Sequence, residues 1–320
     1  MKSQLQMFIL TLVCVASAQA AETYPVKPIR YIIPYATGGG TDILGRILAQ
    51  KLSERIGQQV LVDNRPGAGS IVGSELLVKA PPDGYTMMTA NIAHGANPYL
   101  HKTLPYNTAR DFTPVALLAL LPSVLVVHPS VPARSVKEFI ALAKSKPGQL
   151  SYGTAGSGSA NHLTMELFKV VTGTNIVHIP YKGGGPAGVD LVAGQIQAMF
   201  ITVPPSLAYV RAGRLRALGL SGKKRSGALP DTPTVIEAGV PGFEVYEWQG
   251  VVVPLATPQP VVDRLNREIN AVLELPDVRE RIVGLGADVA GGSAAQFAEH
   301  IRKELELWRK AISQAGIGAN

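Results

Sequence analysis

Short apolar segments rich in β-branched residues alternate with amphipathic segments along most of the chain. The run IRYIIPY at residues 29–35 is typical of a buried strand, and residues 42–56 follow it with apolar side chains at helical spacing. Residues 58–64 and 85–90 continue the series as further strands. Strands joined by helices form parallel sheets covered on both faces, so this order predicts an α/β fold.

A second series of the same kind begins near residue 123. Its predicted strands are residues 123–129, 149–154, 176–181 and 196–201, and its predicted helices are residues 136–145, 160–172 and 186–194. Two more helices are predicted at 261–275 and 294–315. Residues 124–143 and 250–269 each have the pattern of a strand, a proline-containing turn and a helix, which is also common in unrelated folds. Two similar lobes are one interpretation of this repetition.

The N-terminus has the pattern of a secretory signal. A lysine near the start precedes an apolar run at 7–16, and Ala-Gln-Ala at 18–20 fits a cleavage site. The run is too short for a membrane span. Cys14 raises the alternative of a lipoprotein, but Val13 stands where lipid attachment needs a small residue. The mature protein is therefore expected to begin at Ala21 and to reside in the periplasm.

Composition narrows the range of functions. Cys14 is the only cysteine, so the mature chain has no disulfide and no thiolate metal site, and the histidines show no ligand spacing. No cofactor or metal is predicted. The net charge of +7 is spread along the chain, and the one dense basic run, at 222–227, is read as a solvated loop. With few aromatic residues near basic ones, nucleic-acid binding is disfavoured.

Three glycine-rich segments each join a predicted strand to a predicted helix. They are PYATGGGTD at 34–42, YGTAGSGSANHL at 152–163 and YKGGGPAG at 181–188. The first lacks the lysine of a phosphate-binding loop and has Ile43 where a dinucleotide fingerprint needs glycine. A helix N-terminus presents free N–H groups and a partial positive charge, and glycine lets a ligand approach them. The three loops together predict a ligand cleft that binds an anion through the backbone.

Catalytic patterns are weak by comparison. Ser157 and Ser159 lack the surroundings of a nucleophile elbow, and His162 is as well explained by a structural role as by a pocket role. Asp42 fits a helix cap better than a general base. A secreted α/β hydrolase that uses these serines with His162 remains an alternative, but no nucleophile, base and orienting group assemble from the pattern. The chain is therefore predicted not to be an enzyme.

The glycine loops and the segments around them closely resemble the Bug family, the extracytoplasmic solute-binding proteins of tripartite tricarboxylate transporters. The resemblance runs from about Tyr24 to Ile317. It is carried by YPVKPIRYIIPYATGGGTDILGRILAQKL, VDNRPGAGSIVGSELLVKAPPDGYT, YGTAGSGSANHL, HIPYKGGGPA and LPDTPTVIEAGVPGFE. It implies a type II periplasmic-binding-protein fold, with two α/β lobes joined by crossing hinge strands. The lobes are expected to comprise residues 21–123 plus 247–320, and residues 124–246.

The resemblance also implies a function. Such a protein captures a small carboxylate between the first and second glycine loops and delivers it to membrane permease subunits, and it is expected to act as a monomer. A ligand sensor for a signalling partner is the alternative. The expected ligand-binding residues are Tyr35, Gly38, Gly39, Gly40, Thr41, Asp42, Asn91, Thr154, Ala155, Gly156, Ser157, Gly158, Ser159, His162, Lys182, Ile201 and Thr202.

One departure from the family pattern bears on the ligand. Many relatives have aspartate where this chain has Ile201, a position that tends to face the distal part of the ligand. An ammonium group buried there would lack a carboxylate partner. A ligand with one carboxylate and an apolar or aromatic remainder is therefore expected to bind better than glutamate or citrate.

Overall fold

The computed structural model describes residues 24–284 and 286–315. Its strands are β1 (Ile29–Ile33), β2 (Val60–Asn64), β3 (Thr86–Asn91), β4 (Phe112–Val127), β5 (Ser151–Thr154), β6 (Val177–Pro180), β7 (Ala198–Thr202), β8 (Arg216–Leu220), β9 (Tyr246–Pro254) and β10 (Asp288–Val289). Its helices are α2 (Gly40–Ile56), α3 (Ile71–Val78), α4 (Ile92–Leu100), α5 (Val136–Ser145), α6 (Ala160–Thr172), α7 (Gly184–Val192), α8 (Val203–Arg211), α9 (Gln259–Leu273), α10 (Pro276–Gly284) and α11 (Ala294–Ala315), with a 3-10 turn η1 (Ala68–Ser70).

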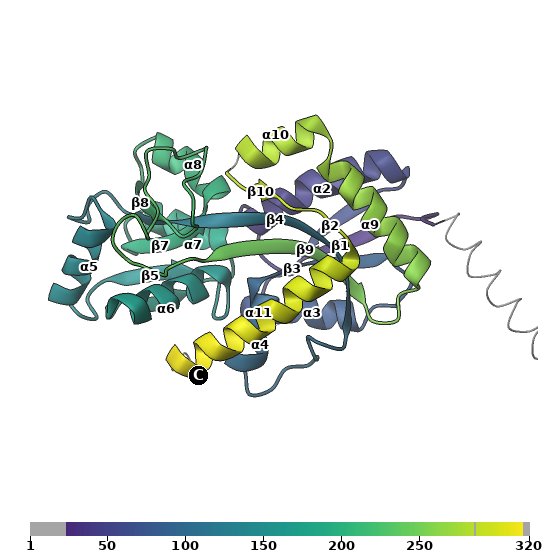
Figure 1. Cartoon of the computed structure of the whole chain (residues 1–320), viewed down its shortest axis with the longest axis horizontal. Helices are drawn as coiled ribbons and strands as arrows, with labels where there is room; N and C mark the ends of the chain where they lie inside the picture. The colour runs from purple at the N-terminus through teal and green to yellow at the C-terminus, as the bar shows by residue number, and fades with distance from the viewer. Residues whose placement is uncertain (1–23, 285, 316–320) are drawn as a thin grey trace, which may run out of the picture.

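Strands from both halves of the chain follow the order β2-β1-β3-β9-β4-β7-β5-β6, and β8 and β10 also pair with β4. β1 is parallel to β2 and β3, which confirms the parallel pairing predicted for the first series. In the second series β5 is parallel to β6 and β7, but residues 123–127 of β4 are antiparallel to β7. β9 is antiparallel to both of its neighbours, so the sheet is mixed. Figure 1 shows helices packed around two strand groups, with β4 and β9 extending between them.

β4 is the long strand that connects the two groups. Its residues 112–122 pair with β9, whereas residues 123–127 pair with β7 and β8. No strand is assigned from the sequence to residues 112–122, where Pro114 and Pro122 are unusual in a central strand. The structure accommodates Pro114 beside a register shift, and Pro122 lies where the pairing partner changes. The crossing strands expected from the resemblance are therefore present as β4 and β9.

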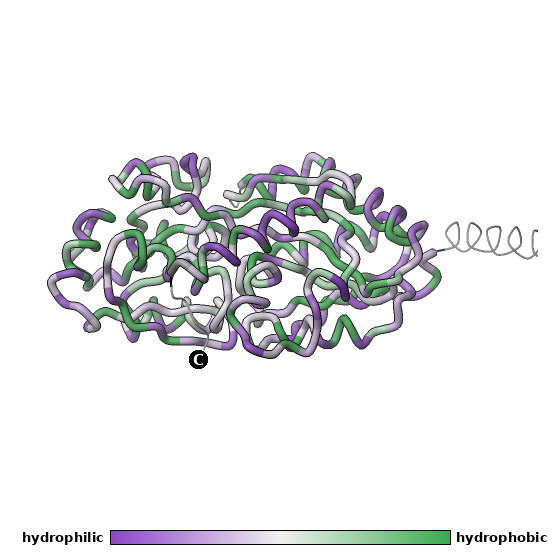
Figure 2. Tube along the Cα trace, turned by 60° about the horizontal axis from the view of Figure 1, so that its bottom comes forward, coloured by the Kyte–Doolittle hydropathy of each residue, from purple (hydrophilic) through white to green (hydrophobic). Residues whose placement is uncertain are grey.

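Each strand group has its own buried core, and a third cluster spans both. Tyr31, Leu52 and Val253 belong to the core around α2 and α9, whereas Leu191 and Met199 belong to the core around α7 and β7. Hydrophobic stretches run through both halves in Figure 2, and hydrophilic stretches lie on the outer helices. The predicted α/β class is therefore confirmed, with two strand groups linked by β4 and β9 as the resemblance implies.

Some expectations lie beyond what the structure tests. The division into residues 21–123 plus 247–320 and residues 124–246 stays a prediction. The signal peptide lies outside the described residues. Within the described chain, no helix has the length and apolar character needed to cross a membrane.

Candidate functional site

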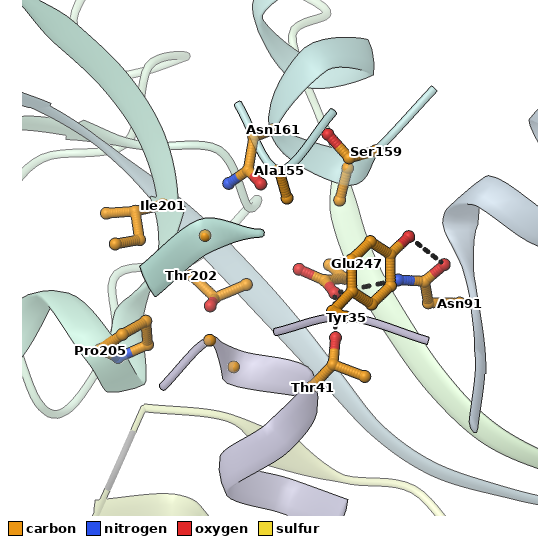
Figure 3. Close-up of a pocket in the computed structure, with 14 residues that line it drawn as sticks. Tyr35, Thr41, Asn91, Ala155, Ser159, Asn161, Ile201, Thr202, Pro205 and Glu247 are labelled. Carbon is orange, nitrogen blue, oxygen red and sulfur yellow. Dashed lines mark hydrogen bonds between the residues drawn. The ribbon is translucent and has the colours of Figure 1, made fainter. Parts of the chain in front are cut away.

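A pocket opens where the β1–α2 loop faces the loops that precede α6, α7 and α8. Its empty space is about 410 Å³, which includes space that is open to solvent. Its lining residues are Tyr35, Gly39, Gly40, Thr41, Asn91, Ala155, Ser159, Ala160, Asn161, Gly184, Ile201, Thr202, Pro205 and Glu247. In Figure 3, Ile201 and Pro205 lie on one side of the pocket, and Asn91, Tyr35 and Glu247 lie on the other.

Five helices begin at this pocket. Gly40 and Ala160 are the first residues of α2 and α6, Gly184 is the first residue of α7, and Asn91 and Thr202 precede α4 and α8. The first N–H groups of a helix have no acceptor within the helix, and the aligned peptides place about half a positive charge there. The pocket therefore has a positive potential that comes from the backbone.

The side chains of the pocket add no positive charge. Among the described lining residues there is no lysine, arginine or histidine, and the only ionisable side chains are Tyr35 and Glu247. Burial raises the pKa of the Tyr35 hydroxyl far above its ordinary value, so this group stays neutral. An anion in the pocket would be held by N–H groups and hydroxyls, because no cationic side chain reaches it.

Glu247 is a carboxyl group buried at the start of β9. It is 7% exposed, and its Oε1 accepts hydrogen bonds from Thr41 Oγ1 at 3.3 Å and Asn91 Nδ2 at 3.5 Å. Asn91 in turn accepts a hydrogen bond from the Tyr35 hydroxyl at 3.3 Å, and Gln249 Nε2 donates to Thr41 Oγ1 at 3.4 Å. Figure 3 shows Glu247 between Thr41 and Asn91. Burial raises the pKa of Glu247 from 4.5 to about 7.

The structure brings about half of the predicted ligand-binding residues to the pocket. Those in the lining are Tyr35, Gly39, Gly40, Thr41, Asn91, Ala155, Ser159, Ile201 and Thr202. Those outside the lining are Gly38, Asp42, Thr154, Gly156, Ser157, Gly158, His162 and Lys182. Ile201 is 4% exposed and faces the cavity, as the argument about the ligand requires. Contact with a ligand stays a prediction for all of these residues.

The second glycine loop uses several of its N–H groups internally. Gly156 N donates to Thr154 Oγ1 at 3.2 Å, Gly158 N donates to His162 Nδ1 at 3.2 Å, and Ser159 N donates to the Gly156 carbonyl at 3.1 Å. These donors are therefore occupied, and the loop glycines are needed for their left-handed φ angles of 115° and 77°. The first turn of α6, which follows this loop, adds N–H groups that have no acceptor within the helix.

Two charged residues among the predictions point elsewhere. The Asp42 carboxylate accepts hydrogen bonds from Gly38 N at 3.1 Å, Arg46 Nε at 3.0 Å and Asn64 Nδ2 at 2.9 Å, outside the pocket. Asp42 thus stabilises the first glycine loop from the side that faces away from the pocket. The three donors hold the pKa of its carboxyl below the ordinary value. Lys182 is exposed and does not line the pocket.

The serines that a hydrolase would need are not paired with His162. Ser159 Oγ donates to the Gly156 carbonyl at 2.6 Å, and Ser157 is exposed. His162 stacks on His178 with ring centroids 4.3 Å apart, and burial lowers its pKa. Within the described chain, these side chains form no nucleophile and base.

Glycines of all three loops also make close contacts between the two strand groups. A Cβ on Gly185 of α7 would lie 2.6 Å from the Thr37 carbonyl oxygen, and a Cβ on Gly183 would lie 2.7 Å from Ala36 Cβ. We call this set of contacts the glycine seam. Its members are Gly40, Gly158, Gly183 and Gly185 of the three glycine segments, together with Gly69 of η1. The third glycine segment thus packs against the first, and the residues on the two sides of the pocket are in contact.

Five lining residues were not predicted from the sequence: Ala160, Asn161, Gly184, Pro205 and Glu247. Ala160, Asn161 and Gly184 lie within the second and third glycine segments, in the first turns of α6 and α7, but they were not among the residues expected to bind the ligand. Glu247 had a recognisable signal, because it is a lone acidic residue in the otherwise uncharged strand YEWQGVVVP. Charged side chains are rarely buried unless they are paired, and perturbed ionisable groups cluster at functional sites, so a glutamate in a buried strand is a candidate for such a site.

Comparisons with known proteins agree with this architecture. The family model described as "Tripartite tricarboxylate transporter family receptor" matches residues 44–317. The UPF0065 protein in the tcbD-tcbE intergenic region of Pseudomonas sp. strain P51 is 41% identical over 304 residues, covering 95% of this chain and 90% of that protein. Protein BugT of Bordetella pertussis is 36% identical over 306 residues, covering 94% and 93%.

Solved structures give the same result. The structure of R. palustris Rpa4515 with adipate has a TM-score of 0.89 and 36% identity, and the match covers 92% of this chain and 98% of that chain. MatC from Rhodopseudomonas palustris with bound malate has a TM-score of 0.87 and 31% identity, covering 90% and 100%. The resemblance to the Bug family is thus confirmed. With a family model that matches most of its length and relatives aligned end to end, the chain belongs to the tripartite tricarboxylate transporter receptor family of periplasmic solute-binding proteins.

Proposed function

We propose that this protein binds a small carboxylate in the pocket between its two strand groups and delivers it to a tripartite tricarboxylate-type permease. The observation that supports this most strongly is the meeting of five helix N-termini at a cavity whose described lining has no cationic side chain. A carboxylate suits such a site, because its oxygens accept several N–H groups at once. Export through a cleaved signal peptide would place the protein where family members act.

The donors proposed for the carboxylate are the first-turn N–H groups of α2 and α6. Gly40 and Thr41 begin α2, Ala160 and Asn161 begin α6, and all four line the pocket. Hydrogen bonds to a charged group contribute roughly 1.5–3 kcal/mol each, so four would supply on the order of 10 kcal/mol before ordering costs. A micromolar complex needs about 8 kcal/mol.

The rest of the ligand is proposed to be apolar or aromatic. Ile201 and Pro205 form an aliphatic wall on the side opposite Glu247, and Ala155 and Ala160 add small apolar surfaces. Burying an apolar group against them gains roughly 25 cal/mol per Å². Two related proteins have adipate and malate bound in their solved structures. Both molecules are small carboxylates, and adipate has an apolar chain.

A panel of carboxylates tests the proposal. Calorimetry with benzoate, nicotinate, adipate, malate, glutamate and citrate should show binding of at least one acid with an apolar or aromatic body. Glutamate and citrate should bind more weakly. Tightest binding of glutamate would contradict the proposed ligand class, and failure of every acid would contradict carboxylate capture itself.

A further inference from the structure

A carboxyl side chain in an anion pocket raises a chemical problem. Glu247 lies in the same cavity as the helix N-termini proposed to hold the ligand, close to Thr41 at the start of α2. Two carboxylates in one desolvated site repel each other strongly, and such pairs keep one proton between them. An anionic ligand can bind here only if Glu247 gives up its charge or is kept away from the ligand.

The geometry of Glu247 leaves one oxygen available. Both hydrogen bonds to the carboxyl, from Thr41 and Asn91, fall on Oε1. Neither bond falls on Oε2; the Gln249 side chain, which donates to Thr41, lies close to the carboxyl and favours its ionised form, although burial outweighs this effect. Glu247 also lines the cavity, so Oε2 is the oxygen that a bound molecule can reach.

Among the described residues that line the pocket, no cationic side chain compensates a charge on Glu247. β9 packs against β3, β4, α3 and α4, and it also contacts α2 through Thr41 and α11 through Phe297 and His300. On α2, Arg46 pairs with Asp42; on α11, His300 packs on Trp248, whose side chain points to the other face of the strand, and burial lowers the pKa of His300.

The ionisable side chains of β3, β4, α3 and α4 are Glu75, His94 and Tyr99. Glu75 pairs with Lys79 at the surface. His94 is 2% exposed and packs edge-on against Phe112, and burial lowers its pKa to about 4, so it is neutral. Of the groups in the pocket, Tyr35 stays protonated.

We propose that Glu247 binds the ligand as a neutral acid, donating a hydrogen bond from Oε2 to the bound carboxylate, so that ligand capture takes up one proton. This inference rests on the proposed function, since it assumes that the ligand is an anion held at the start of α2 and α6. The proton comes from solvent, no covalent bond forms or breaks, and Thr41 and Asn91 keep Oε1 as the acceptor. Glu247 then adds a donor to a site whose other donors are backbone N–H groups, hydroxyls and the side-chain amides of Asn91 and Asn161.

The pH dependence has a defined sign. Burial raises the pKa of free Glu247 to about 7, and a neighbouring anion raises it further. Affinity is therefore constant below about pH 7, falls by up to tenfold per pH unit above it, and levels off once the pKa of the complex is passed. The acids used as probes are fully ionised throughout this range, so the dependence is that of the protein.

Calorimetry of the full mature chain tests the proposal, with benzoate or adipate as the probe, whichever binds more tightly. Affinities are measured from pH 6 to pH 9, and at pH 8 in phosphate and in Tris, whose ionisation heats differ. We expect weaker binding as pH rises above 7 and uptake of close to one proton per ligand at pH 8. Glu247→Gln, which carries a permanent amide donor of the same shape, should show neither the pH dependence nor the proton uptake.

Other outcomes overturn the inference in distinguishable ways. Binding that does not depend on pH and takes up no proton contradicts the neutral-acid role while leaving carboxylate capture intact. Binding that strengthens as pH rises and is lost in Glu247→Gln contradicts the neutral-acid role, because it shows that the ionised form of Glu247 favours the bound state. If neither probe binds at any pH, the proposed function and this inference fail together. The pH profile of the unmodified protein needs no variant, so misfolding of Glu247→Gln does not prevent a decision.

Discussion

The glycine seam predicts that a single methyl group on α7 weakens ligand binding without harming the fold. In Gly185→Ala the new Cβ would lie 2.6 Å from the Thr37 carbonyl oxygen, whereas an ordinary contact begins at 3.4 Å. The two segments must therefore separate by the difference, about 0.8 Å. Thr37 and Gly185 lie on opposite sides of the pocket, so this separation opens the site in which the ligand is held.

The magnitude follows from the cost of overpacking. Inserting a methyl group into a close contact costs typically 1–3 kcal/mol, and each 1.4 kcal/mol changes an equilibrium tenfold. If the ligand binds only when the seam is closed, the dissociation constant rises roughly 5- to 100-fold. Gly185 is the second residue of α7, where alanine favours the helix, so the melting temperature of the free protein should be unchanged or slightly higher.

Gly188→Ala is the matched control. Gly188 lies in the same helix, but its Cβ would meet nothing closer than Ile201 Cδ1 at 3.9 Å, an ordinary contact. Calorimetry with adipate or benzoate, together with thermal melting, should show weakened binding in Gly185→Ala alone. Unchanged affinity in Gly185→Ala would show that the seam is not needed for binding. An equal loss in both variants would show that the effect comes from the helix.

Further predictions concern stability, specificity and processing. Folding raises the pKa of Glu247 from 4.5 to about 7, so the free energy of unfolding of the unmodified protein should fall as pH rises through this interval. Glu247→Gln lacks this titration. Denaturant unfolding should therefore show that the free energy of unfolding of Glu247→Gln, relative to the unmodified protein, is about 3 kcal/mol higher at pH 8 than at pH 4. Ile201→Asp should shift preference toward amine-bearing acids, and calorimetry that shows glutamate still excluded would argue against a ligand contact at Ile201. Gly39→Val should weaken carboxylate binding with little loss of stability, because its Cβ would meet no atom within 4 Å and its φ of −84° is ordinary; unchanged affinity would show that the ligand stays clear of Gly39. N-terminal sequencing of periplasmic protein should begin at Ala21, and a lipidated Cys14 would contradict the predicted cleavage.

The sequence predicts the local framework of this protein well. The strand and helix around the first glycine loop and those around the second appear where hydrophobic periodicity places them, because a strand or helix is largely determined by residues close in sequence. α2 begins at Gly40 rather than Asp42, since Gly39 serves as the N-cap. Ile201 lines the pocket, and this position was expected from the resemblance to the Bug family.

The rest depends on contacts between distant segments. Glu247 reaches the pocket only because β9 lies beside β3, which brings it to Asn91, 156 residues earlier in the chain. The contact between Gly185 and Thr37 is likewise invisible to a local pattern, since glycine is equally expected in an ordinary turn. Internal hydrogen bonds of Gly156 and Gly158 depend on the exact loop conformation, so their N–H groups could be judged only in three dimensions.

The backbone origin of the pocket's positive potential has a consequence for how such proteins diversify. Helix N-termini survive almost any substitution of the side chains around them, because the dipole belongs to the peptide groups. Recognition of charge is therefore separated from recognition of shape: Ile201 and Pro205 can change to fit a new molecule while the helix N-termini still bind its carboxylate. A receptor built in this way starts each evolutionary change of ligand with part of its affinity already in place, which makes the cavity a favourable scaffold for directed selection of sensors for acids not found in nature.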